Sequence, residues 1–176
     1  MSDPSPAEIR HIGIVGVGQM GRGIAHVCAL AGLDVVMTDV SGDALSVARQ
    51  IIDQNLSRQV ARGRIREEDK AAALGHIAAA PDYAAFGDCD MVIEAATEKE
   101  AVKREIFQKL VPALKPDALI ASNTSSISIT RLAAATDRPG KFIGMHFMNP
   151  VPVMALVELI RGIATDVATF ATSRYV

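Results

Sequence analysis

The sequence predicts an α/β fold: a doubly wound, mainly parallel sheet with helices on both faces. Short apolar runs alternate along the chain with longer amphipathic segments, as βαβ units require. The first run leads into Gly16, Gly18 and Gly21, spaced G-x-G-x-x-G, and residues 24–33 then form a helical segment of small and apolar side chains. A strand, a glycine turn and a helix in this order indicate a Rossmann-type dinucleotide-binding unit.

The glycine positions and the next strand predict which dinucleotide binds. Gly16 permits a tight turn, Gly18 lets the backbone approach a pyrophosphate, and Gly21 lets the helix lie close to the strand. The second apolar run, residues 34–38, ends at Asp39, whose carboxylate is placed to accept hydrogen bonds from the adenosine ribose. That charge would repel the extra phosphate of NADP, and no Arg follows it directly. We therefore expect NAD; the alternative is an α/β turn without a nucleotide.

A helical hairpin insertion is expected after the second strand. Ser41 and Asp43 resemble a helix start, apolar residues then recur at helical spacing, and Gly63 separates this helix from a charged one over residues 66–74. The insertion carries a basic cluster: Arg58, Arg62, Arg64 and Arg66. This cluster is either a solvated face or a platform for an anionic, phosphate-bearing substrate.

Four further strands are expected, over residues 76–80, 89–95, 118–121 and 141–147. A helix after the second of these carries an apolar stripe made of Val102, Ile106, Leu110 and Leu114. Ligands bind at the carboxyl ends of parallel strands, which places Glu98 near the cofactor and Lys103 one helical turn further on. Residues 122–126, five small polar side chains, follow the next strand and offer hydroxyl and amide groups to a ligand or cap a helix.

The segment His146–Glu158 suggests a proton-transfer pair. Two apolar runs flank Asn149-Pro150-Val151-Pro152, and a reversal centred on Pro152 would put Glu158 opposite His146. Met154, Leu156 and Ile160 share the strand face of Glu158, so we expect a buried carboxylate that needs His146 as its partner. Such a pair fixes the His tautomer and suits acid–base chemistry near neutral pH. A core histidine without a chemical role is the alternative.

Composition limits the possible partners. Of the 176 residues, 49% are apolar and 22% charged, with a net charge of −2, which argues against nucleic acid or an anionic membrane as the main partner. No apolar run approaches the roughly 18 residues of a membrane span. Cys28 and Cys89 fit no disulfide framework or metal spacing, so we expect reduced core thiols, no metal and a cytoplasmic protein.

Four blocks of sequence carry a family resemblance. They are I-G-I-V-G-V-G-Q-M-G-R-G-I-A, V-I-E-A-A-T-E-K-E-A-V-K, A-S-N-T-S-S-I-S-I-T and G-M-H-F-M-N-P-V-P-V-M, in that order. With these blocks the chain, from about Ile9 to Thr169, resembles the L-3-hydroxyacyl-CoA dehydrogenase family and is 3-hydroxybutyryl-CoA dehydrogenase-like. The resemblance implies reversible hydride transfer between the 3-hydroxyl of an acyl-CoA and NAD.

The resemblance also implies residue roles. His146 would be the general base, Glu158 its orienting carboxylate, and Ser125 and Asn149 would hold the substrate oxygen and the nicotinamide end. Coenzyme A would contact the helical insertion, with Ser57, Arg62 and Arg64 as candidates. The implied NAD contacts are Gly16, Gly18, Gln19, Met20, Gly21, Asp39, Glu98, Lys103, Ser125 and Asn149.

Two departures from the family pattern shape the expected domain organisation. Ala155 stands where relatives usually carry Lys, and the family continues as an all-helical domain that closes over the acyl chain and supplies most of the dimer interface. We expect a flexible terminus at residues 1–8, the NAD-binding domain at 9–162, and the start of a truncated helical domain at 163–176. A homo-oligomer is possible although the usual dimerisation domain is absent. The expected behaviour is NAD binding with weak or no turnover. The alternatives are an NAD-binding module without turnover and a dehydrogenase of a non-CoA hydroxy acid.

Overall fold

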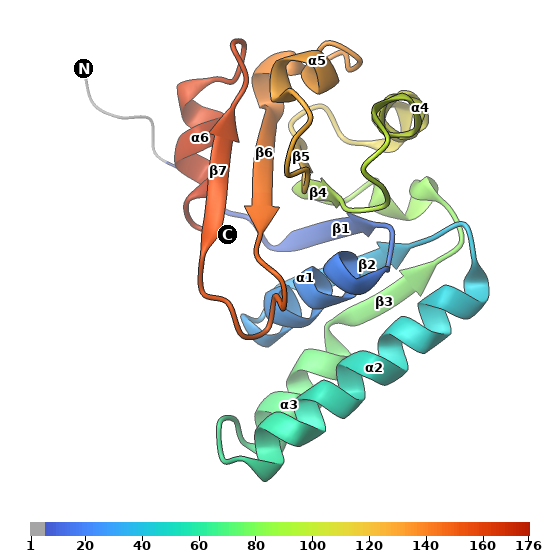
Figure 1. The fold of residues 1–176 in the computed structure, drawn as a ribbon, viewed down its shortest axis with the longest axis vertical. Helices are drawn as coiled ribbons and strands as arrows, with labels where there is room; N and C mark the ends of the chain where they lie inside the picture. Colours follow the sequence, from blue (N-terminus) through green and yellow to red (C-terminus); the bar gives the residue numbers. More distant parts are fainter. Residues whose placement is uncertain (1–5) are drawn as a thin grey trace.

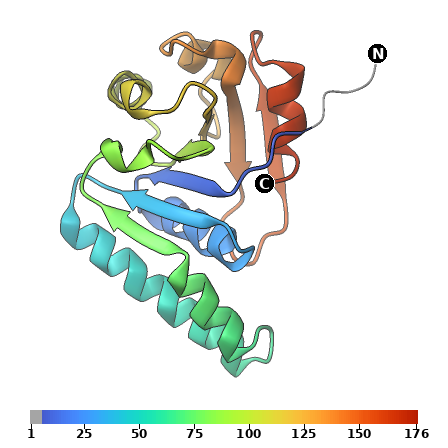
Figure 2. The same ribbon diagram turned by 180° about the vertical axis from the view of Figure 1, so that it is seen from behind.

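A computed structural model describes residues 6–176 (Figures 1 and 2). The expected flexible terminus, residues 1–8, lies mostly outside the described part, but the backbone N–H of Ala7 donates to Thr172 Oγ1 at 3.0 Å. The elements in chain order are β1 (His11–Val15), α1 (Gln19–Leu30), β2 (Asp34–Thr38), α2 (Gly42–Ala61), α3 (Glu67–Gly75), β3 (Ile77–Ala80), η1 (Tyr83–Phe86), β4 (Met91–Glu94), α4 (Glu100–Leu110), η2 (Val111–Ala113), β5 (Leu119–Ser122), α5 (Ile129–Ala133), η3 (Pro139–Lys141), β6 (Phe142–Phe147), β7 (Val157–Arg161) and α6 (Val167–Ser173).

One seven-stranded sheet organises the described residues, in the order β3-β2-β1-β4-β5-β6-β7. The strands β1 to β6 pair in parallel, and β7 pairs antiparallel with β6. From β1 the chain adds β2 and then β3 on one side. It then crosses back to β4 on the other side of β1 and continues outward to β7, so the strand order reverses between β1 and β4. This doubly wound arrangement confirms the predicted fold class, including the α2–α3 hairpin after the second strand (Figure 1). Ligands bind at the carboxyl side of such a switch point.

Two apolar layers cover the sheet. The helices α1, α2, α3 and α6 contribute to one buried cluster, which also takes in Ile14, Met37 and Met145 of the strands. The second cluster, on the other face, joins α4, α5 and η1 through Phe86, Phe107 and other residues. The predicted core thiols are confirmed, since Cys28 and Cys89 are both free and buried, and burial raises the pKa of each to about 12.

Two helices differ from the sequence prediction. The predicted helix over residues 24–33 begins earlier, at Gln19, and ends at Leu30, because the chain turns at Gly32, which has a φ of +86°. The predicted stripe on α4 was partly wrong. Val102 is exposed, whereas Lys103 and Phe107 lie on the buried face. The helix ends at Leu110, and the 3-10 turn η2 follows it.

The last helix, α6, packs on the sheet. Thr169 Oγ1 donates to the carbonyl of Gly140 at 2.8 Å, and Arg161 lies over the ring of Phe170, with 5.7 Å from Cζ to the centroid. These contacts tie residues 167–173 to the β6–β7 side of the sheet. The domain division at residue 163 stays a prediction.

Candidate active site

The turn between β1 and α1 is built to receive an anion. Gly16 has a φ of +85°, and its N–H donates to Thr38 O at 2.9 Å, which ties the turn to β2. A Cβ on Gly21 would lie 1.8 Å from Gly16 O, so only glycine lets α1 approach the strand this closely. Gly18 caps α1 without a side-chain hydrogen bond, and the first turn holds no acidic residue. The free N–H groups and the helix dipole therefore favour a phosphate here.

Asp39 is held rigidly at the end of β2. Its Oδ2 accepts from the N–H of Val17 at 2.9 Å, and its Oδ1 accepts from the N–H of Ser41 at 3.1 Å. Ser41 also caps α2 by accepting from Ala44 N, as the sequence predicts. Each carboxylate oxygen keeps further acceptor capacity, so Asp39 can receive ribose hydroxyls without leaving its place.

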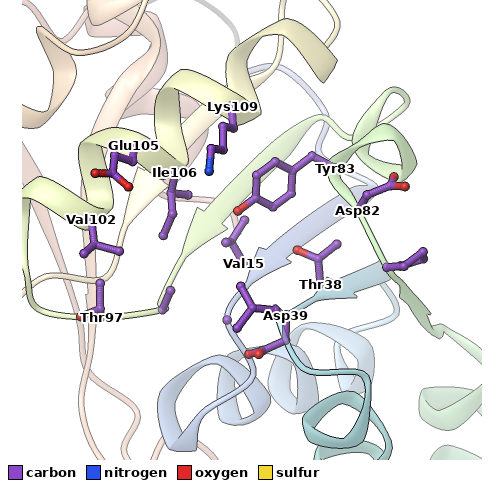
Figure 3. A pocket seen from close by; sticks show the side chains of 14 residues that line it. Val15, Thr38, Asp39, Asp82, Tyr83, Thr97, Val102, Glu105, Ile106 and Lys109 are labelled. Carbon is purple, nitrogen blue, oxygen red and sulfur yellow. The ribbon is translucent and has the colours of Figure 1, made fainter.

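A cavity of about 570 Å³ opens beside Asp39 (Figure 3). Figure 3 shows Val102, Ile106 and Lys109 of α4 on one side, and Thr38, Asp39 and Tyr83 on the other. Val40 at its border is fully exposed. The remaining lining residues are Val15, Gly16, Pro81, Asp82, Ala96, Thr97 and Glu105. The mixture of apolar walls and a fixed carboxylate fits an adenosine group. Together with the open approach at Gly18, it fits a dinucleotide.

The loops after β4 and β5 are joined by Glu98. Its Oε1 accepts from Thr124 Oγ1 at 2.6 Å and from the N–H of Ser125 at 2.9 Å, and both the N–H and the hydroxyl of Ser126 also reach it. Burial alone would raise the pKa of Glu98, but the hydrogen bonds from Thr124 and Ser125 and the charge of Lys103 outweigh it and hold this pKa below its usual value. Glu98 therefore stays ionised and fixes the segment that carries Ser125.

Lys103 lies beneath this loop instead of at the surface. Its side chain is 0% exposed, and its Nζ contacts Glu94 Oε2 at 2.6 Å. Glu98 Oε2 is also 3.9 Å from the Lys103 ammonium. A cofactor can reach Glu98 directly, whereas Lys103 acts on the site through the two carboxylates that surround it.

His146 and Glu158 form the predicted pair. The two residues are direct partners in the β6–β7 ladder, and His146 Nδ1 lies 2.8 Å from Glu158 Oε2. The carboxylate fixes the tautomer with the proton on Nδ1, which leaves the lone pair of Nε2 free to accept a proton. The pairing was predicted from the symmetry of the reversal about Pro152, and the register confirms it.

The expected burial of Glu158 was wrong. The Glu158 side chain is 53% exposed, against 22% for His146. Met154, Leu156 and Ile160 are also exposed. On this face of the sheet, Ile129 of α5 lies beside Ile160, where a Cβ on Gly144 would meet both side chains. Exposed apolar side chains therefore surround the acid–base pair.

The loop after β6 meets the glycine turn. Gln19 Nε2 donates to Asn149 Oδ1 at 3.1 Å, which orients the Asn149 amide. A Cβ on Gly23 would lie 2.9 Å from Val151, so α1 and this loop pack closely. Asn123 Oδ1 accepts from the N–H of Phe147 at 2.9 Å and joins β5 to β6. Gly18, Ser125, Asn149 and His146 thus lie on loops and strand ends that contact one another.

Comparison with known proteins decides the family. The sequence model for "3-hydroxyacyl-CoA dehydrogenase, NAD binding domain" matches residues 11–176. The chain belongs to this family. It is 61% identical over 168 residues to a 3-hydroxybutyryl-CoA dehydrogenase of Bradyrhizobium diazoefficiens, covering 96% of this chain and 57% of that protein. A probable 3-hydroxybutyryl-CoA dehydrogenase of Deinococcus radiodurans is 46% identical, with 88% and 55% covered.

A solved structure agrees with the sequence comparison. The crystal structure of (S)-3-hydroxybutyryl-CoA dehydrogenase from Ralstonia eutropha matches with a TM-score of 0.93 and 48% identity, covering 96% of this chain and 59% of that one. The chain thus spans little more than half the length of each of these three relatives. Its fold is that of their NAD-binding domain.

The residues expected to contact coenzyme A lie on the α2–α3 hairpin. Ser57 Oγ donates to Asp53 O and accepts from Lys70 Nζ at 2.9 Å, so it is engaged within the hairpin. Arg62 is the C-terminal cap of α2, and Arg64 is in the turn that follows. Among residues 6–176, no side-chain hydrogen bond or ion pair links Arg62 or Arg64 to the glycine turn or to His146. Their role with coenzyme A stays a prediction.

Sequence reasoning missed two parts of the site. Glu94 was included only as part of an apolar strand, although an acidic side chain within such a run, followed by Lys103 in the next helix, could have suggested a buried pair. Tyr83 and Ile106 of the cavity carried no signal, because they come from segments that meet only in the folded chain.

Between residues 6 and 176, no group of three or more His, Cys, Asp or Glu side chains is arranged to hold a metal ion. None of the helices in this range combines the length and apolar character needed to cross a membrane.

Proposed function

We propose that this chain is the cofactor-binding and base-bearing part of an NAD-dependent 3-hydroxyacyl-CoA dehydrogenase acting on a short substrate such as 3-hydroxybutyryl-CoA. The observation that carries the proposal is the His146–Glu158 contact of 2.8 Å between β6 and β7, in a sheet whose first strand leads into a dinucleotide-type glycine turn. The family membership and the 61% identical relative support the substrate class.

Each end of the cofactor has a proposed place. The pyrophosphate lies at the N-terminus of α1, with the N–H groups of Gln19 and Met20 beside Gly18. The adenosine ribose binds Asp39, and the adenine enters the cavity. The nicotinamide half lies over β4 and β5, near Glu98 and Ser125. When bound, NAD supplies the hydride acceptor.

The chain's own residues handle the proton. In the oxidation direction, His146 Nε2 takes the proton of the substrate 3-hydroxyl while the hydrogen on that carbon leaves as hydride. Glu158 stabilises the resulting imidazolium through its contact with Nδ1. Ser125 and Asn149 hold the substrate oxygen, and Glu98 and Gln19 fix their positions through the hydrogen bonds described above. In reduction, His146 returns the proton to the ketone oxygen.

The test is acetoacetyl-CoA-dependent oxidation of NADH by this chain, with NADH binding titrated on the same sample. We expect NADH to bind and to be oxidised slowly, since the apolar surface around His146 is open to water. Oxidation should be lost in His146→Gln while NADH binding persists. Free acetoacetate, which lacks coenzyme A, is the substrate control. Faster oxidation with acetoacetate would indicate a non-CoA hydroxy acid dehydrogenase, and equal oxidation by His146→Gln would contradict the assignment of the base.

A further inference from the structure

The buried pair of Glu94 and Lys103 has no role in the reaction described above. Glu94 Oε2 contacts Lys103 Nζ at 2.6 Å and accepts from Ser122 Oγ at 2.9 Å, while Oε1 accepts from the N–H of Ala96 at 2.9 Å. Both charged side chains are 0% exposed. Removing two charges from water is costly, and a buried ion pair is often replaceable by apolar side chains without loss of stability. Stability alone therefore does not account for the pair.

The position of the pair suggests another role. Glu94 is the last residue of β4 and lies beside Ser122, the last residue of β5, in the parallel ladder. These two strand ends form the half of the switch point opposite Asp39, and a dinucleotide spanning the switch point places its nicotinamide half there. Glu98 lies in the same loop region, with Oε2 3.9 Å from Lys103 Nζ.

The charges of this cluster do not balance. Two carboxylates, Glu94 and Glu98, share the single ammonium of Lys103, which leaves one negative charge. The nearby Glu100 is paired with Arg131. Without Glu94, Lys103 would neutralise Glu98. Glu94 thus keeps the Lys103 ammonium shared between two carboxylates, so that the cluster retains one net negative charge beneath the ligand.

We propose that Glu94 is a positioning residue that sets the redox preference of the cofactor site. By holding Lys103, it keeps the nicotinamide half net negative and so favours the positively charged ring of NAD⁺ over the neutral ring of NADH. This inference rests on the proposed binding of NAD. It assigns a specificity between the two redox forms to a residue that need not touch either of them.

The experiment compares three ligands with three proteins. NADH is titrated by its fluorescence, NAD⁺ by calorimetry, and ADP-ribose, which lacks the nicotinamide ring, by calorimetry as a control. The proteins are the wild type, Glu94→Gln, and the double variant Glu94→Gln/Lys103→Met, in which the buried pair is removed as a neutral unit. The measured quantity is the ratio of the dissociation constants for NAD⁺ and NADH. Any unfolded fraction in a sample cancels in this ratio.

The expected shift follows from Coulomb's law. For unit charges about 10 Å apart and effective dielectric constants of about 20 to 40, loss of one negative charge raises this ratio about 4- to 16-fold. Glu94→Gln should show this rise with unchanged ADP-ribose affinity. The double variant, which restores one uncompensated carboxylate, should return within about twofold of the wild-type ratio.

Several results would overturn the inference. Parallel weakening of all three ligands in Glu94→Gln would mean a structural role only, and an unchanged ratio would mean that the charge does not reach the ring. If Glu94→Gln alone does not fold, the double variant can still refute the inference, because a ratio shifted by more than about twofold contradicts the charge balance. Failure of the wild type to bind any of the three ligands would instead refute the proposed function.

Discussion

The glycine turn allows a prediction with a matched pair of substitutions. A Cβ on Gly18 would meet no atom within 4 Å, whereas a Cβ on Gly21 would lie 1.8 Å from Gly16 O and 2.9 Å from Gly16 C. Gly18 also has a φ of −58°, which alanine adopts freely. Gly18→Ala should therefore change the free energy of unfolding by no more than about 1 kcal/mol, the usual range for a helix cap. Gly21→Ala forces one backbone segment away from another.

The cost of Gly21→Ala follows from that overlap. No rotamer change can relieve a contact with a backbone carbonyl, so we expect a loss of about 3 kcal/mol or more, at the upper end for overpacking. For a domain of this size that corresponds to a melting temperature lower by about 6–12 °C. Gly18→Ala should melt within about 4 °C of the wild type but should bind NADH at least about tenfold more weakly, because its methyl group occupies the approach to the pyrophosphate.

Thermal unfolding and NADH fluorescence titration measure the two effects separately. We expect opposite patterns: a stable protein with poor NADH binding for Gly18→Ala, and a destabilised protein for Gly21→Ala. A Gly18→Ala protein that binds NADH like the wild type would show that the pyrophosphate does not approach this turn. A Gly21→Ala protein with wild-type melting would show that α1 and β1 are not packed as described.

Three further predictions concern charged groups. Glu158→Gln should slow acetoacetyl-CoA-dependent NADH oxidation by about tenfold or more, because His146 loses its orienting carboxylate. NADH binding, titrated in parallel, should stay within about twofold of the wild type. Oxidation at the wild-type rate would remove Glu158 from the mechanism. Asp39→Asn should narrow the preference for NADH over NADPH by about tenfold, since it removes the negative charge but keeps one acceptor oxygen for the backbone N–H groups. An unchanged preference in competition titrations would contradict the proposal that Asp39 binds the adenosine ribose. Burial raises the pKa of Asp90, but the hydrogen bonds from Lys115 and from the N–H groups of Arg10 and His11 outweigh it and lower this pKa to about 2. Because the pKa of Asp90 is lower in the folded state than in the unfolded state, Asp90 contributes about 2 kcal/mol to the free energy of unfolding above about pH 4, and this contribution is lost as the pH falls toward 2. Asp90→Asn should therefore reduce the fall in the free energy of unfolding between about pH 4 and pH 2. An unchanged fall would place the acid-sensitive group elsewhere.

The sequence predicted those features that depend on local pattern. The second strand over residues 34–38 has the predicted bounds, and Ser41 caps α2 at the predicted helix start. The His146–Glu158 register followed from counting residues about Pro152, since strand pairing in a short reversal is set by its length.

Features that depend on distant contacts could not be predicted in the same way. The Glu94–Lys103 pair joins a strand to the following helix, and Lys103 lies on the buried face of α4, whereas the predicted apolar stripe ran through the exposed Val102. The expected burial of Glu158 failed because sequence pattern identifies an apolar face but not what covers it. The cavity beside Asp39 brings together β1, β2, η1 and α4, which only the tertiary fold makes neighbours.

A crystal structure of this chain with NAD⁺ would show whether the cofactor lies across the switch point. We expect the adenosine ribose on Asp39 with the adenine in the cavity of about 570 Å³, the pyrophosphate at the N-terminus of α1, and the nicotinamide ring near Glu98 and within reach of His146. A dinucleotide bound in the reverse direction, or at another surface with the α1 N-terminus left free, would contradict it.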